Sequence, residues 1–155
     1  MAEYSANAIQ TVNPGESVVF TDSPVPCNRG LIRHRDDTGN FLLSGWLPNR
    51  FVGCCCKRRT SADYLIDFGA NISLPTGGTA GDISLAIAID GASIPASTMT
   101  VTAAEDGVYN ISRAINADIW RGCCETISVV NTSDQAVQIQ NANIIFSRPD
   151  LAVSY

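Results

Sequence analysis

Five of the six cysteines stand in two contiguous runs, Cys54-Cys55-Cys56 and Cys123-Cys124, so thiol chemistry is the first possibility to weigh. Along a strand successive side chains face opposite sides, so Cys54 and Cys56 share one face while Cys55 points away. Structural zinc sites pair ligands two to four residues apart, and this spacing is missing, so we expect no metal site. A disulfide between the runs requires neighbouring strands and an oxidising compartment. Small buried or interface side chains are the simpler interpretation, and the thiol state stays open.

His34 is the only histidine, so a Cys-His or Ser-His nucleophile pair would have to use it. No Gly-x-Ser-x-Gly signature accompanies it, and Arg33 and Arg35 flank it in an expected strand, which is typical of a surface or interface side chain. Asp36-Asp37 resembles the carboxylate pair of a glycosidase, but adjacent aspartates in a turn usually stabilise the turn itself. We therefore expect no catalytic residue and no cofactor. An enzyme that uses His34 and a cysteine is kept as a third hypothesis.

Basic residues are concentrated in one stretch of the chain. Of the ten, nine are Arg, and seven lie between positions 29 and 59: Arg29, Arg33, Arg35, Arg50, Lys57, Arg58 and Arg59. The net charge is −5, which disfavours a general nucleic-acid binder, because such proteins need clustered positive charge. The arginines fit a solvated rim or ion pairs between subunits, since planar guanidinium is a preferred partner of carboxylates. They also fit docking onto an acidic partner surface, and we take these seven as the candidate docking residues.

Two tryptophans, Trp46 and Trp120, are candidate ligand contacts of a carbohydrate-binding surface. Aromatic residues of this kind more often belong to the core or to a subunit contact. The sequence allows both a ligand contact and a core or subunit contact.

The elements that position these residues are expected to be strands. Residues 82–91 alternate small or polar side chains with Ile and Leu before an Asp-Gly turn, which is typical of a half-buried strand that enters a hairpin. The same pattern predicts strands over residues 4–12, 17–20, 31–35, 41–46, 63–74, 94–102, 108–120, 124–130 and 136–146, with a turn at 36–40. Strands at this spacing predict an all-β protein, an antiparallel β-sandwich of the jelly-roll kind.

Composition sets the broad class. A chain of 155 residues with 45% hydrophobic content suits one globular domain with a real core. No uninterrupted apolar stretch of about 20 residues is present, so we expect no membrane span. Residues 1–4 open no basic-then-apolar leader, so we expect synthesis in the cytoplasm without a signal peptide.

Four segments resemble consecutive strands of a tumour-necrosis-factor-like jelly roll. They are residues 64–73 (YLIDFGANIS), 83–91 (ISLAIAIDG), 124–133 (CETISVVNTS) and 140–145 (QNANII). They are most similar to the globular heads of bacterial collagen-like surface and spore-coat proteins and to related phage- and prophage-encoded virion proteins. The resemblance covers about residues 63–148 and implies a homotrimer around a threefold axis. The chain has no Gly-X-Y repeat, so a fibrous stalk is not expected.

The resemblance suggests a division into an N-terminal β region for docking (1–60), a jelly-roll core (61–148) and a C-terminal tail (149–155), within one compact domain. It favours a non-enzymatic homotrimeric structural protein on a phage virion surface, as a capsid decoration or as the knob of a head fibre or tail tip. The expected partners are copies of the chain itself and a capsid or other virion protein. The alternative is a carbohydrate- or receptor-binding module on a bacterial surface, with a host-surface glycan as ligand.

Overall fold

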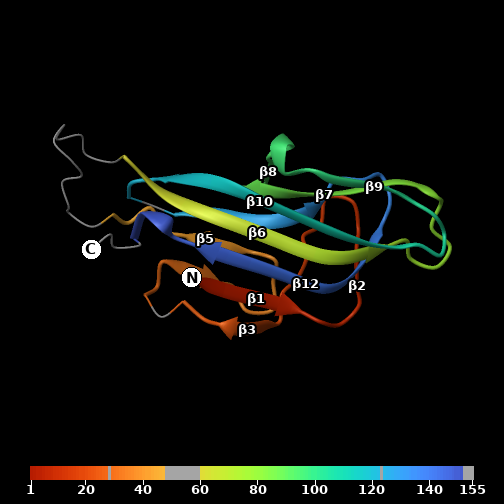
Figure 1. Ribbon diagram of the computed structural model, residues 1–155, viewed down its shortest axis with the longest axis horizontal. Helices are drawn as coiled ribbons and strands as arrows, with labels where there is room; N and C mark the ends of the chain where they lie inside the picture. Colours follow the sequence, from red (N-terminus) through yellow and green to blue (C-terminus); the bar gives the residue numbers. More distant parts are fainter. Residues whose placement is uncertain (28, 48–59, 123, 152–155) are drawn as a thin grey trace.

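The computed structural model describes residues 1–27, 29–47, 60–122 and 124–151, and these residues form two packed antiparallel sheets (Figure 1). Sheet A contains, in order, β10 (Val108–Trp120), β6 (Ser61–Ser73), β12 (Val137–Ser147), β1 (Ala2–Ala6) and β3 (Asp22–Val25), with β2 (Gln10–Val12) also paired to β12. Sheet B contains β4 (Ile32–His34), β5 (Phe41–Leu43), β11 (Glu125–Asn131), β7 (Gly81–Ile89) and β8 (Ala92–Ser93), with β9 (Met99–Ala103) also paired to β7. Two short 3-10 helices, η1 (Pro95–Ser97) and η2 (Pro149–Leu151), complete the described elements. The predicted all-β antiparallel sandwich is confirmed.

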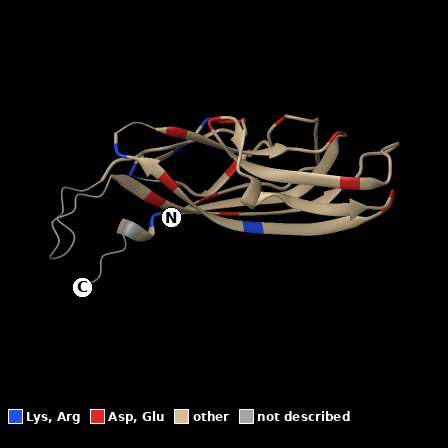
Figure 2. Ribbon diagram, turned by 90° about the horizontal axis from the view of Figure 1, so that it is seen from above, with Lys and Arg blue, Asp and Glu red and all other residues tan. Residues whose placement is uncertain are grey.

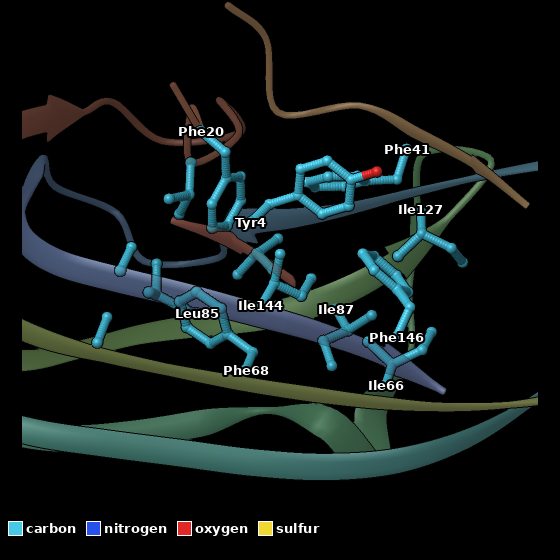
Figure 3. Packing of buried hydrophobic residues seen from close by; sticks show 14 of the residues in the cluster. Tyr4, Phe20, Phe41, Ile66, Phe68, Leu85, Ile87, Ile127, Ile144 and Phe146 are labelled. Carbon is cyan, nitrogen blue, oxygen red and sulfur yellow. The ribbon is translucent and has the colours of Figure 1, made fainter. Parts of the chain in front are cut away.

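The core lies between the sheets because each strand turns alternate residues inward. In β6 every second residue from Ala62 to Ile72 is at most 2% exposed, while the residues between them face solvent. An aromatic group closes one side of this core, where the Phe41 ring lies 4.9 Å from both the Tyr4 and the Phe146 rings and 5.3 Å from Phe20 (Figure 3). Each fully buried ring of this size stabilises the fold by about 1.5–3 kcal/mol.

The first 43 residues contribute strands to both sheets. β1 pairs with β12 and with β3 in sheet A, and β4 and β5 form a hairpin that pairs with β11 in sheet B. The predicted hairpin around residues 36–40 is confirmed, with Asp37 in the left-handed region at φ 56°. The division of the chain at residues 60 and 148 stays a prediction.

Three predicted strands are wrong in detail. Residues 94–102 contain the 3-10 helix η1, and the strand β9 begins only at Met99. Residues 4–12 form two strands rather than one, because β12 contains a bulge and β1 and β2 pair with the parts of β12 on either side of it. Asn141 makes the bulge with φ 52°, a conformation that Asn tolerates better than most residues. Residues 17–20 form only an isolated bridge, Ser17 to Val130, because their backbone bonds connect to different partners, Val129 and Thr38.

Candidate functional site: the tryptophan end and the outer face of sheet A

The two exposed tryptophans lie at the same end of the sandwich, which we call the tryptophan end. Trp120 is the last residue of β10 and is 69% exposed, and Trp46 follows β5 and is 53% exposed. The contact between the two segments is at Gly45, the residue before Trp46. The Gly45 backbone packs so closely on Trp120 that an added Cβ would lie 1.8 Å from the Trp120 carbonyl oxygen. The structure therefore brings together two residues that the sequence separates by 74 positions.

A buried polar network holds the Trp46 segment in place. Arg148 is 8% exposed, donates from Nη2 to the Trp46 carbonyl at 3.2 Å and from Nη1 to the Tyr64 hydroxyl at 3.3 Å, and lies 4.7 Å from the centre of the Tyr64 ring. The Tyr64 hydroxyl lies 2.8 Å from the Ser44 carbonyl and 3.1 Å from the Leu31 carbonyl. Because the buried Arg148 guanidinium is hydrogen-bonded to both segments, it holds Trp46 and Tyr64 in a fixed arrangement.

Three of the seven candidate docking residues fall within the described structure. Arg29, Arg33 and Arg35 are exposed around β4, the edge strand of sheet B, and form no hydrogen bond or ion pair through their side chains with the described residues. The remaining four, Arg50, Lys57, Arg58 and Arg59, lie outside the described residues, as do Cys54, Cys55, Cys56 and Cys123.

Charge is distributed unevenly from end to end (Figure 2). The described basic residues lie between the tryptophan end and the middle of the molecule, and the opposite end shows only acidic ones. Its loops and strand ends contain Glu16, Asp82, Glu105, Asp106 and Asp134. The far end is therefore acidic, whereas basic and acidic residues are mixed toward the tryptophan end.

His34 is part of the aromatic group of the core. Its ring stacks on Phe41 at 4.6 Å and contacts Tyr4 at 5.1 Å, and its Nε2 donates to the Thr38 carbonyl at 2.9 Å. Within the described chain no hydrogen bond joins His34 to a cysteine. The ring faces the core and only partly reaches solvent, so His34 is half-buried rather than fully exposed, and its place in an interface stays a prediction.

The pKa values of Tyr4 and Cys27 are both shifted beside this group. Burial raises the pKa of the Tyr4 phenol, and so does the charge of Cys27, while a backbone hydrogen bond at Cys27 lowers it and Asp36 raises it. At Cys27 burial is the largest influence and raises the pKa of the thiol. Backbone N–H groups of Arg29, Ile32 and Leu31, with the amino terminus, outweigh burial and hold that pKa below its ordinary value.

The outer face of sheet A, meaning the side of its strands turned away from the core, divides into two halves. On β10, β6 and β12 the half toward the far end is uncharged and consists of Val108, Asn110 and Ser112 on β10, Gly69, Asn71 and Ser73 on β6, and Gln138, Gln140 and Asn143 on β12. Asp22 of β3, opposite Ser5 of β1, is charged and lies at the level of Asn143. Asn110 donates to Asn71 at 3.0 Å within the uncharged half, and Val108 is 70% exposed.

The half toward the tryptophan end is acidic. It consists of Ala114, Asn116, Asp118 and Trp120 on β10, Ser61, Asp63, Leu65 and Asp67 on β6, Ile145 and Ser147 on β12, and Glu3 on β1. Neither half contains a Lys or Arg among the described residues. Three of the exposed large apolar side chains, Leu65, Val108 and Trp120, lie on this one face.

Three further features of the described residues concern ligands, metal ions and membranes. An open groove of about 220 Å³ is lined by residues from Ala6 to Thr21, including Ala8, Thr11, Val12 and Val19, and contains none of the predicted site residues. The described residues contain no group of three His, Cys, Asp or Glu side chains placed to hold a metal ion. None of the helices in the described part of the chain is long and apolar enough to span a bilayer.

Sequence reasoning missed the Arg148 network and the outer face of sheet A. Arg148 follows a strand and precedes a proline, which gives no local sign of burial. The outer face could have been found by placing β6, β10 and β12 side by side, but this needs the pairing register.

Comparison with solved structures identifies the fold. The chain matches the globular domain of zebrafish complement 1qA protein with a TM-score of 0.59 and 11% identity, over 93% of this chain and 94% of that one. Pika GITRL matches with a TM-score of 0.41 and 12% identity over 90% and 96% of the two chains. A family 35 carbohydrate binding module from Clostridium thermocellum matches with 0.36 and 12% over 92% and 91%. The last two are too distant to support an argument.

No known protein-family description matches the sequence, and no curated protein matches it. The chain therefore has the jelly-roll fold of the C1q globular domain, which confirms the predicted jelly roll, and at this identity the likeness concerns the fold alone.

Proposed function

We propose that this protein is a non-enzymatic binding protein that works as a homotrimer on the surface of a phage virion. One observation supports the proposal above all, namely the outer face of sheet A. It exposes Leu65 and Trp120 toward the tryptophan end and Val108 toward the far end, has an uncharged half on β10, β6 and β12, and has no basic residue among those described. A lack of charged residues is typical of the central part of a protein–protein contact. The virion setting rests on the resemblance of residues 63–148 to phage-encoded jelly rolls.

The self-contact can be tested by placing a large charge on this face. Gly69 is suitable because an added Cβ would meet its nearest neighbours at 3.7 Å and 3.9 Å, so the single chain tolerates a side chain there. We expect the wild type to be a trimer by native mass spectrometry and Gly69→Arg to be a folded monomer. Thr100→Arg, on the exposed side of β9, is the matched control and should stay trimeric. Equal masses for Gly69→Arg and wild type would contradict the assignment of this face.

Attachment to the particle is assigned to the arginines around β4. Arg29, Arg33 and Arg35 are exposed and have no side-chain partner among the described residues, so they are available to carboxylates of a capsid or other virion protein. The triple charge reversal to Glu should remove the protein from purified particles while leaving the trimer intact. Glu105→Arg, at the opposite end, is the control. Unchanged occupancy of the triple variant on particles would refute this attachment site.

A second candidate function is carbohydrate or receptor binding by the tryptophan end. The observation that favours it is that two exposed tryptophans, Trp46 and Trp120, lie at the same end of the sandwich, since aromatic faces bind sugar rings and receptor side chains. Glycan-array binding that is lost in Trp46→Ala and in Trp120→Ala would favour this function. Binding that survives both substitutions, or no binding by the wild type, would rule it out.

A further inference from the structure

The strand β4 has a neighbour on one side only. It lies at the end of sheet B, and among the described residues it pairs with β5 alone. The Ser44 amide donates to the Leu31 carbonyl at 2.8 Å, and the Arg35 amide donates to the Asn40 carbonyl at 3.1 Å. Bonded and non-bonded pairs alternate along an antiparallel ladder, so residues 31, 33 and 35 are the ones bonded to β5. The residues between them turn their backbone groups toward the open edge.

These residues are Ile32 and His34, and they differ in how their backbone groups are used. The Ile32 N–H is directed at the Cys27 sulfur. The backbone N–H and C=O of His34 form no hydrogen bond with any described residue. One residue with both groups free is what an added antiparallel strand needs for a bonded pair. The edge is therefore open to a strand centred opposite His34.

The side chains on β4 indicate what such a strand contains on its outer side. Arg33 is exposed and faces away from the core, and the alternation continues to Arg35, which is also exposed. Two positions on one face of a strand lie about 6.6 Å apart, and Cβ atoms opposite each other across a strand pair are about 4.5–5.5 Å apart. Neither guanidinium has a partner among the described residues. Carboxylates two positions apart on the added strand would therefore meet Arg33 and Arg35.

The position between those two carboxylates faces inward, beside His34. The His34 ring stacks on Phe41 at 4.6 Å and contacts Tyr4 at 5.1 Å, and it is only half-buried. An apolar side chain at this position would cover the part of the ring that still reaches solvent, which is favourable because it removes apolar surface from water. The central residue of the added segment is therefore expected to be apolar.

Charge also excludes a second copy of β4 as the added strand. Pairing two copies with His34 opposite His34 would place Arg33 against Arg35, and like charges on edge strands oppose such self-pairing. Asp36 and Asp37 follow in the turn and are exposed, so a carboxylate beyond Arg35 would meet its own kind of charge. The fitting segment therefore has two carboxylates separated by one apolar residue.

We propose that β4 binds an extended acidic segment of a partner protein by antiparallel strand addition, with an apolar residue opposite His34 and carboxylates opposite Arg33 and Arg35. The inference deepens the attachment assigned to the arginines around β4 and rests on it. Strand addition contributes two backbone hydrogen bonds that fix the register, and the arginines select the acidic sequence.

A capped peptide with Glu-Val-Glu at its centre is the probe, and fluorescence anisotropy with the intact protein measures its dissociation constant. Arg33→Glu should weaken binding by about tenfold or more, because a carboxylate of the peptide then meets like charge. A peptide N-methylated at the central Val has the same charge but no N–H for the His34 carbonyl, and it should bind about fivefold or more weakly. Arg113→Glu makes the same change in net charge at an exposed residue of β10 and should bind as wild type.

The outcomes separate the mode of binding from the attachment site. Equal binding of the methylated and unmodified peptides would overturn strand addition and leave docking by the arginines in place. Failure of the wild type to bind the unmodified peptide at millimolar concentration would overturn the acidic segment, even if the triple arginine variant is lost from particles. Unchanged occupancy of that triple variant would overturn the attachment site and this inference with it. Circular dichroism of every variant checks that the sandwich is folded.

Discussion

At the scale of single residues, the tryptophan end is organised by one buried cation. Arg148 bonds to a backbone carbonyl and to a phenol and lies over an aromatic ring, so its charge is solvated by the protein instead of water. The sequence could not predict this role, because each partner lies far away along the chain. Local patterns did predict the alternate burial of strand residues, since that depends only on neighbours two positions apart.

Removing the Tyr64 hydroxyl should destabilise the protein by about 1–2 kcal/mol, because buried carbonyls of Leu31 and Ser44 lose a donor. Tyr64→Phe keeps the ring and its packing against Arg148. Urea unfolding at equal protein concentration, followed by tryptophan fluorescence, measures the change. Tyr109→Phe is the matched control, since the Tyr109 hydroxyl accepts a solvent-exposed hydrogen bond from the Ala104 amide. This substitution should lower the free energy of unfolding by less. Equal losses for the two variants would contradict the importance of the buried network.

At the scale of elements, strand positions were predictable and strand partners were not. The long strands β6, β7, β10, β11 and β12 fall where alternation and turn residues place them. The bulge at Asn141 shifts the inward side of β12 from odd to even positions, and this is what divides the first expected strand into β1 and β2. Such a shift depends on pairing between distant strands, which a single sequence does not encode locally.

Close approach between elements gives a second test. Gly45→Ala should destabilise the protein by more than about 1 kcal/mol and alter tryptophan fluorescence. The reason is that the new Cβ would overlap the Trp120 carbonyl and force the two segments of the chain apart. Gly69→Ala is the control, since its Cβ would make ordinary contacts in a strand. Thermal unfolding of both variants at one concentration checks the expectation. A Gly45→Ala protein as stable as Gly69→Ala would mean that this contact does not position the two tryptophans.

At the scale of the whole molecule, the surfaces of the sandwich differ in chemical character. The β4 edge presents arginines, and the far end presents carboxylates. The outer face of sheet A presents amide and apolar side chains in one half and carboxylates in the other. The excess of basic residues between positions 29 and 59 can be read directly from the sequence. The uncharged half of the outer face needed the register of three strands, because its members are spread between positions 69 and 143.

The central claim is that this outer face assembles copies of the chain into a closed trimer, and sedimentation equilibrium of the intact wild-type protein tests it most directly. The account predicts a species of three times the 16.5 kDa chain mass that persists as the concentration is lowered through the micromolar range. A mass equal to one chain at high concentration, or a mass that grows without limit, would contradict it.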